Sequence, residues 1–371
     1  MRIIVSGGHF SPAHSLIREL KKRGHEVALA GRKYTFEGDN VESLEYQIAK
    51  KENILFFEIK TGRIQRKFSR HTISSFLKVP LGLLNSISVI SKFKPDIVIT
   101  FGGYIGFVVS YASFLKKIPV ILHEQTQRAG LSAKLISVIA KKVCISFESS
   151  RSYFPSKKVV FTGVPIREEI YTIKTSINVE LGYPVIYITG GSSGSHFINS
   201  LVFKVLDALV AKFVIIHQTG DSQKYDDFNI LNKKRESLNQ EAKKRYILRK
   251  FIYPDEIGYV LNTADLVVAR SGINTVVELL SCGATSFLIP LSHGQQGEQL
   301  QNAKLINEAG IGEYMEERYI TPNKFIEKIK EMAKNIKKYE KYKKEARRYV
   351  VLDATQRIVR MAEEAYDEKT G

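Results

Sequence analysis

The sequence has 371 residues, 44% of them hydrophobic and 25% charged, which suggests two soluble globular domains and is too apolar for a disordered chain. Its only two cysteines, Cys144 and Cys282, lie far apart in apolar runs. This excludes a disulfide scaffold and a cysteine-rich zinc site, and it fits a reducing cytoplasm. The formal charge is +18, the first residues lack the apolar run of a signal peptide, and no uninterrupted apolar run reaches the roughly 18 residues of a membrane span.

The first half of the chain predicts a parallel sheet with intervening helices. A short apolar strand, Arg2–Ser6, runs into glycines and is followed by a helical pattern over Pro12–Arg23 and a second strand at Val27–Gly31. This order is a βαβ unit, which implies parallel strands. Further strands are predicted at 54–58, 96–101, 119–123, 142–146 and 158–161.

A basic and apolar segment lies within this half. Residues 1–170 carry 27 basic and 13 acidic side chains, and the stretch 59–94 contains eight basic residues and no acid. Basic side chains interleaved with apolar ones favour an anionic surface, a membrane leaflet or a nucleic acid; the alternative is a solvated helix face over an ordinary core. We predict a membrane patch and no nucleic acid. The patch consists of Arg63, Arg66, Lys67, Phe68 and Arg70.

The strand pattern restarts in the second half. Pro184–Thr189 is a strand that again runs into glycines, and a helix begins near Ser195. More strands are predicted at 213–217, 245–248, 266–269 and 286–289, with a linker around 163–176 and an amphipathic helix over Ala354–Ala365. The sequence therefore predicts two similar α/β units, each with a parallel sheet that holds ligands at the carboxyl ends of its strands.

Three polar segments of the second half suit a nucleotide sugar. Gly190-Gly191-Ser192-Ser193-Gly194-Ser195 lies between a strand and a helix, where glycines let the backbone approach a phosphate; an ordinary tight turn is the alternative. Glu278 follows another strand and could accept two ribose hydroxyls, or be a solvated or capping acid. The amide-rich segment that begins at His293 is interpreted as a loop that binds sugar hydroxyls and leads into a helix over Asn302–Glu308, with a flexible polar loop as the alternative.

Polar clusters of the first half also follow strands. Ser6-Gly7-Gly8-His9, Gly102-Gly103-Tyr104 and His123-Glu124-Gln125 each end a predicted strand, so they converge on one sheet edge. His9 could act as a general base, because an unperturbed imidazole has a pKa of about 6.5; a role in capping the next helix is the alternative. No metal-ligand motif and no Asp-x-Asp occurs. From the sequence, we expect that the protein requires no cofactor. Whether its activity depends on a divalent metal stays open.

Eight segments, taken in order, resemble the MurG family within glycosyltransferase family 28. The resemblance runs from Met1 to about Gly312. The segments are Ser6–Ala13, Gly102–Tyr104, His123–Gln125, Gly163–Arg167, Gly190–Gly194, Phe251-Ile252, Arg270–Glu278 and Gln299–Ala303. Each is a weak signal alone, but their order and spacing are specific.

The resemblance implies a GT-B fold, with two Rossmann-like parallel-sheet domains facing a cleft. Residues 1–165 would hold a lipid acceptor and face the membrane, residues 176–350 would hold the UDP-sugar, and a C-terminal helix at about 351–368 would pack back on the first domain. The implied donor-binding residues are Ser6, Gly8, Arg167, Gly191, Ser192, Ile252, Glu278, Gln299 and Asn302. Of these, Arg167, Gly191 and Ser192 would face the diphosphate, Ile252 the uracil, Glu278 the ribose, and Gln299 and Asn302 the sugar.

On the acceptor side the resemblance implies Tyr104, Gln125 and Thr126, with His9 or Glu124 as the catalytic base. The implied reaction is an inverting displacement that moves N-acetylglucosamine from its UDP form to the muramyl sugar of a polyprenyl-pyrophosphate-linked peptidoglycan precursor. Such an enzyme would be peripheral, on the cytoplasmic face of the cell membrane.

The sequence departs from the family pattern at four places. These are Val5-Ser6 in place of Gly-Thr, Thr126 in place of Asn, Val164 in place of Asn, and Glu298 in place of His. These departures leave open a related transferase with another lipid acceptor. A UDP-sugar epimerase and a non-catalytic subunit that recruits a partner to membranes are two further alternatives, of other functional classes.

Overall fold

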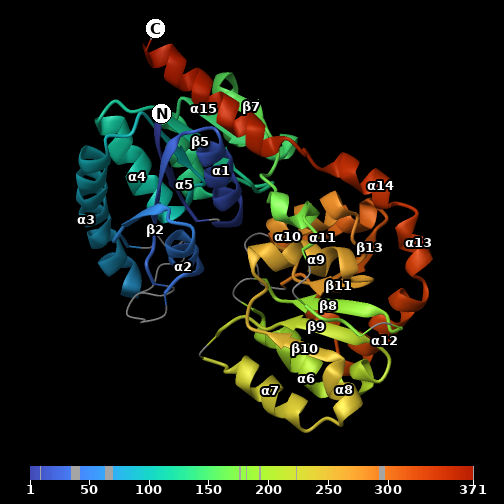
Figure 1. Ribbon diagram of the computed structural model, residues 1–371. Helices are drawn as coiled ribbons and strands as arrows, with labels where there is room; N and C mark the ends of the chain where they lie inside the picture. Colours follow the sequence, from blue (N-terminus) through green and yellow to red (C-terminus); the bar gives the residue numbers. More distant parts are fainter. Residues whose placement is uncertain are drawn as a thin grey trace. The chain divides into compact units, whose positions relative to one another are not determined.

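The chain forms two compact units, made of Met1–Arg167 with Val351–Gly371 and of Glu168–Val350 (Figure 1). The computed structural model describes residues 1–8, 10–34, 42–62, 70–174, 177–180, 182–191, 194–222, 224–291 and 297–370, with the backbone alone at 70–77 and 369–370. We call the two parts unit 1 and unit 2.

Seven parallel strands form the sheet in the described part of unit 1, in the order β3-β2-β1-β4-β5-β6-β7. The strands are β1 (Arg2–Ser6), β2 (Glu26–Gly31), β3 (Leu55–Glu58), β4 (Ile97–Thr100), β5 (Val120–Glu124), β6 (Lys142–Ile145) and β7 (Val159–Phe161). The helices are α1 (Phe10–Lys22), α2 (Leu44–Lys51), α3 (Arg70–Phe93), α4 (Gly103–Leu115), α5 (Leu131–Ile139) and α15 (Ala354–Thr370), with short 3-10 turns at Glu148–Tyr153 and Ser156–Lys158.

Side chains of successive strand residues point to opposite faces of this sheet, and both faces are buried. Ile3 and Val5 lie in the core beneath α1 and α15, whereas Ile4, between them in β1, lies in the core beneath α3, α4 and α5 (Figure 1). This follows from the two-residue period of a strand. The last helix thus returns to the first unit, where Ile358 and Val359 are fully buried.

Unit 2 repeats the architecture with six described parallel strands in the order β10-β9-β8-β11-β12-β13. The strands are β8 (Val185–Thr189), β9 (Val214–Gln218), β10 (Tyr246–Arg249), β11 (Leu266–Ala269), β12 (Ser286–Leu288) and β13 (Gly312–Tyr314). The helices are α6 (His196–Val210), α7 (Asp227–Glu236), α8 (Gln240–Lys244), α9 (Pro254–Thr263), α10 (Ile273–Cys282), α11 (Glu298–Glu308), α12 (Pro322–Lys334), α13 (Ile336–Glu340) and α14 (Lys343–Ala346), with 3-10 turns at Glu168–Tyr171, Glu317–Tyr319 and Arg347–Tyr349.

The prediction of two parallel-sheet α/β units is confirmed, with two differences in detail. The short strand β13 was not predicted, because Gly312-Glu313-Tyr314 has neither length nor an apolar pattern. The polar segment before residue 302 was predicted as a loop, but α11 begins at Glu298, four residues earlier. In the described residues no helix is both long and apolar enough to cross a membrane.

Candidate active site

The chain order of unit 2 creates a crevice between β8 and β11. These neighbouring parallel strands are where the strand order reverses, so the chain leaves them toward opposite faces of the sheet. Open α/β sheets bind ligands at such switch points, outside the carboxyl ends of the strands. Two segments singled out from the sequence meet here: the glycine loop after β8, and Arg270-Ser271-Gly272 after β11.

The described part of the glycine loop is tightly folded. A Cβ on Gly194 would lie 2.0 Å from the Thr219 carbonyl oxygen, and Gly194 has a φ of +73°, so no other residue fits there without a shift. The carbonyl oxygen of Gly191 accepts from the Gly194 N–H at 3.0 Å and from the Gln218 amide nitrogen at 2.9 Å. These contacts fix the approach to α6, whose first N–H groups have no acceptor within the helix and can bind an anion.

Arg270 links the two loops. Its side chain lies at the end of β11 and is 8% exposed; Nε donates to Ser195 Oγ at 3.1 Å, and Nη1 lies 2.7 Å from a carboxylate oxygen of Glu317. Burial lowers the pKa of the guanidinium, and the ion pair with Glu317 opposes that shift. The result is a cationic group held against the N-cap residue of α6.

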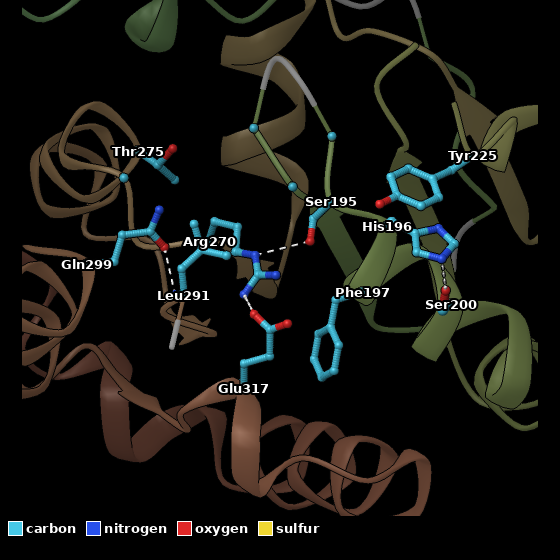
Figure 2. A pocket seen from close by; sticks show the side chains of 14 residues that line it. Ser195, His196, Phe197, Ser200, Tyr225, Arg270, Thr275, Leu291, Gln299 and Glu317 are labelled. Carbon is cyan, nitrogen blue, oxygen red and sulfur yellow. Dashed lines mark hydrogen bonds and ion pairs between the residues drawn. The ribbon is translucent and has the colours of Figure 1, made fainter. Parts of the chain in front are cut away.

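These elements border a cavity of about 810 Å³ (Figure 2). Of the predicted donor residues, Gly191 and Gln299 line it. Other lining residues were not predicted as site residues: Ser195, His196, Phe197, Ser200, Tyr225, Arg270, Thr275, Leu291 and Glu317. Arg270 belongs to the motif Arg270–Glu278, and His196 directly follows the glycine segment that ends at Ser195. Sequence motifs could therefore have indicated both residues. Tyr225 and Glu317 lie in polar stretches without a recognisable pattern.

Asn302 lies on α11 as predicted, whereas Gln299 also lies on this helix rather than in a loop, which corrects the prediction for the residues before Asn302. Gln299 Oε1 accepts from the Leu291 N–H at 3.0 Å, and its main-chain oxygen accepts from Ser271 Oγ at 2.7 Å. Asn302 is 1% exposed and its amide nitrogen donates to the Ser271 carbonyl at 3.1 Å. Asn302 therefore holds the loop after β11 against α11, whereas Gln299 borders the cavity.

Of the other predicted donor residues that the structure describes, Glu278, Ile252 and Arg167 do not line the cavity. Glu278 is on α10 and buried, and Ile252 follows β10, where its N–H donates to Gln218 Oε1 at 2.8 Å. Arg167 is the last residue of unit 1, and Ser192 lies outside the described residues.

The strand ends of unit 1, whose switch point lies between β1 and β4, carry the residues predicted for this unit: Ser6 and Gly8 of the donor set and Tyr104, Gln125 and Thr126 of the acceptor side. Gly7 packs against the loop after β4, because a Cβ there would lie 2.8 Å from the Gly102 carbonyl oxygen. Ser6 and Gln125 are buried at the strand ends, and among the described residues neither Ser6 Oγ nor the Gln125 amide has a partner. Gly8 follows this edge, Tyr104 is the second residue of α4, and His9 lies outside the described residues.

Glu124 is engaged by its own loop. Its carboxylate accepts from the Thr126 N–H at 2.9 Å, the Thr126 hydroxyl at 2.7 Å and the Gly130 N–H at 3.4 Å. Three local donors surround a side chain that is only 7% exposed. Glu124 and Thr126 therefore stabilise the conformation of the loop before α5.

The predicted membrane patch falls almost wholly outside the described residues. Arg63, Arg66, Lys67 and Phe68 are not described, and of Arg70 only the helical backbone at the start of α3 is described. Within the described ranges, no group of three or more His, Cys, Asp or Glu side chains could hold a metal ion.

Comparisons with known proteins agree with this arrangement. A model described as the glycosyltransferase family 28 N-terminal domain matches residues 3–145, and one described as its C-terminal domain matches residues 185–358. A protein of Clostridium tetani is 31% identical over 348 residues, which are 91% of each chain. It is named UDP-N-acetylglucosamine--N-acetylmuramyl-(pentapeptide) pyrophosphoryl-undecaprenol N-acetylglucosamine transferase.

Two solved structures show the same fold. The crystal structure of MurG from Acinetobacter baumannii is 22% identical, with a TM-score of 0.67 over 98% of this chain and 99% of that one. The UDP-GlcNAc 2-epimerase of Neisseria meningitidis, solved with UDP-GlcNAc bound, is 16% identical, with a TM-score of 0.63 over 98% of this chain and 100% of that one.

Proposed function

The chain belongs to glycosyltransferase family 28, and we propose that it moves N-acetylglucosamine from UDP-N-acetylglucosamine to the muramyl sugar of undecaprenyl-pyrophosphoryl-MurNAc-pentapeptide. The observation that carries the proposal is the cavity at the switch point of unit 2, where a glycine loop, the start of α6 and the buried Arg270 meet. Backbone N–H groups and a guanidinium suit a diphosphate, which carries charge both in the donor and in the leaving UDP.

The donor would lie along the carboxyl ends of the unit 2 strands. We assign the diphosphate to Gly191, Ser192 and Arg167, and the transferred sugar to Gln299, whose Oε1 is held by the Leu291 N–H. Because Oε1 is already engaged, the Gln299 amide nitrogen is the atom left to donate to a sugar hydroxyl. Ile252 and Glu278 would face uracil and ribose, with Ser6 and Gly8 completing the donor-binding set.

The chemistry is a direct displacement at the anomeric carbon. The acceptor hydroxyl attacks from the face opposite UDP, the bond to the diphosphate oxygen breaks, the configuration inverts and a base takes the hydroxyl proton. We assign His9 as that base. The three local donors to Glu124 favour a positioning role for that carboxylate, beside Tyr104, Gln125 and Thr126 on the acceptor side.

We also propose that unit 1 rests on the cytoplasmic face of the cell membrane without crossing it. Three neighbouring helices, α3, α4 and α5, expose large apolar side chains: Leu81, Leu84, Phe114, Leu115, Leu131, Leu135 and Val138. Lysines lie on or beside the same helices, at positions 78, 92, 116, 117 and 134. Apolar side chains among basic ones suit an anionic lipid surface, which is also where a polyprenyl-linked acceptor resides.

Purified protein with labelled UDP-N-acetylglucosamine and a panel of lipid acceptors tests the acceptor assignment. The panel contains polyprenyl diphosphate alone, the same lipid with a muramyl-pentapeptide, and a lipid-linked glucosamine. We expect label in the lipid fraction only with the muramyl acceptor. Transfer to one of the others would reassign the acceptor, and the absence of transfer to all three would refute the activity.

A further inference from the structure

A histidine not assigned above stands at the edge of the unit 2 cavity. His196 is the first residue of α6, directly after the N-cap residue Ser195, and its side chain is 46% exposed. Its Nδ1 lies 2.7 Å from Oδ1 of Asp227, the first residue of α7. Because a carboxylate only accepts hydrogen bonds, Nδ1 donates to Asp227, and Nε2 is the second ring nitrogen, which can donate to a ligand when the ring carries both protons.

The carboxylate behind His196 is itself held in place. Asp227 is 8% exposed, and its second oxygen accepts from the amide nitrogen of Asn199 at 2.8 Å. That amide nitrogen also donates to the Thr219 carbonyl at 3.0 Å, and its oxygen lies 3.1 Å from Nε2 of the fully buried His217. A chain of buried polar groups therefore fixes the orientation of the His196 ring.

An aromatic ring also packs against the His196 imidazole and restricts its rotation. Tyr225 stacks on the imidazole with centroids 3.9 Å apart and an interplanar angle of 11° (Figure 2). The nearest described partner of Nε2 is Ser200 Oγ, at 3.5 Å, which is too long for a strong hydrogen bond. Ser200 and both rings border the cavity together with Gly191 and Gly194.

We propose that His196 is a further residue of the donor site that, as an imidazolium, donates from Nε2 to a phosphate oxygen of the bound nucleotide, while Asp227 accepts from Nδ1 and holds the orientation of the ring. The inference rests on the proposed function, because it takes the diphosphate to lie at the glycine loop. A cationic imidazole beside α6 adds to the N–H groups of the helix and to Arg270 in stabilising the charge that develops on departing UDP. The carboxylate of Asp227 offsets the repulsion between this cation and the positive end of the helix.

The test compares the affinities of His196 variants for UDP and for uridine, which lacks phosphate. We expect His196→Ala to weaken UDP binding about tenfold or more, the usual effect of losing a charged hydrogen bond, while uridine binding stays within about twofold. Asp227→Asn should weaken UDP binding in the same direction, and His196→Gln, which retains an N–H donor, should recover part of the loss. Calorimetric titration gives the UDP values, and competition gives the uridine values.

Asp207→Asn is the matched control for Asp227→Asn. It also removes one carboxylate between α6 and α7, because Asp207 on α6 lies 2.6 Å from Lys234 on α7 in an exposed pair. It should leave UDP affinity unchanged. If wild type binds UDP and His196→Ala binds it equally well, the inference is wrong and the proposed function is untouched. If His196→Ala loses UDP and uridine in parallel, or if its melting temperature collapses together with that of His196→Gln, the role is structural and the inference is again wrong. If wild type binds no UDP, both the inference and the proposed function are wrong.

Discussion

Arg270 Nε donates to Ser195 Oγ at 3.1 Å, and this single hydrogen bond joins the end of β11 to the N-cap residue of α6. The same hydroxyl accepts from the Ile198 N–H at 3.4 Å, so it caps the helix while it holds the guanidinium. The two loops at the switch point of unit 2 are thereby fixed relative to each other. The geometry that we propose for the diphosphate therefore exists before a ligand arrives, which lowers the cost of binding.

Gly194→Ala should destroy this geometry. Its Cβ would lie 2.0 Å from the Thr219 carbonyl oxygen, so we expect a large fall in melting temperature and loss of UDP binding. Gly182→Ala is the matched control, because Gly182 also has a positive φ, +97°, but a Cβ there meets nothing within 4 Å. It should lose only about 1–2 kcal/mol of stability from backbone strain, with UDP affinity intact. If both substitutions lowered the melting temperature and UDP affinity equally, the close approach of Gly194 to the Thr219 carbonyl would not explain the effect.

The pH dependence of turnover distinguishes the two predicted bases. If His9 removes the hydroxyl proton, kcat/KM rises with pH through the range near 6.5 where an ordinary imidazole becomes neutral. His9→Ala should abolish that rising limb and lower turnover by about 100-fold or more, with UDP affinity and melting temperature close to wild type. Glu124→Gln should lower the melting temperature by disturbing the Thr126 and Gly130 contacts, yet keep the limb. A limb that survives in His9→Ala but vanishes in Glu124→Gln would reverse the assignment.

Acid should destabilise unit 2 through His217. Burial lowers the pKa of its imidazole from 6.5 to about 3, so between these values the unfolded chain binds a proton that the folded chain does not. Stability therefore falls as the pH drops below 6.5, by about 2 kcal/mol from this group at pH 5. His217→Gln preserves one donor and one acceptor for Asn199 and Tyr246 but does not titrate. Between pH 7 and 5, the melting temperature of His217→Gln should fall less than that of wild type. An identical fall would show that His217 does not cause the loss of stability in acid.

Membrane binding should depend on apolar and basic side chains together. Replacing Leu84 and Val138 by Ser should weaken binding to vesicles that contain anionic lipid, since each side chain is about two-thirds exposed, at 64% and 67%. Replacing Arg63, Arg66, Lys67 and Arg70 by Gln should weaken it further, by about 1 kcal/mol for each charge, and high salt should mimic that change.

Ile230→Ser is the control for the membrane test, because Ile230 is an exposed apolar residue of unit 2, on α7. Cosedimentation with vesicles should show no effect of that substitution. Equal binding of wild type to neutral and anionic vesicles would contradict the electrostatic part of the proposal.

Local patterns were enough to predict the fold. Short apolar strands that end in glycine, such as Arg2–Ser6 and Pro184–Thr189, determine a parallel βαβ order almost unaided. The segment from Glu298 was harder, because Gln299, Gln301 and Asn302 lack apolar periodicity and α11 is stabilised by packing, with Asn302 fully buried. The tertiary packing of α11, rather than a local sequence pattern, therefore determines where this helix begins.

The site was predictable only where a motif contained it. The glycine loop and Arg270 were visible as motifs, but the pairing of His196 with Asp227 joins residues 31 positions apart. Their meeting depends on how α6 packs against α7, which no local pattern specifies. Likewise, the sequence could not reveal that the Glu124 carboxylate is engaged by Thr126 and Gly130, so Glu124 remained an alternative to His9 as the base.

The fold alone does not distinguish group transfer from epimerisation, since MurG and a UDP-GlcNAc 2-epimerase both share this architecture. Tracing labelled UDP-N-acetylglucosamine with and without the lipid-linked muramyl acceptor distinguishes the two reactions. We expect the label to stay in unchanged UDP-N-acetylglucosamine without acceptor, and with acceptor to move to the lipid with inverted anomeric configuration as UDP is released. Conversion of the label to UDP-N-acetylmannosamine in the absence of acceptor, with none in the lipid fraction when acceptor is present, would contradict this expectation.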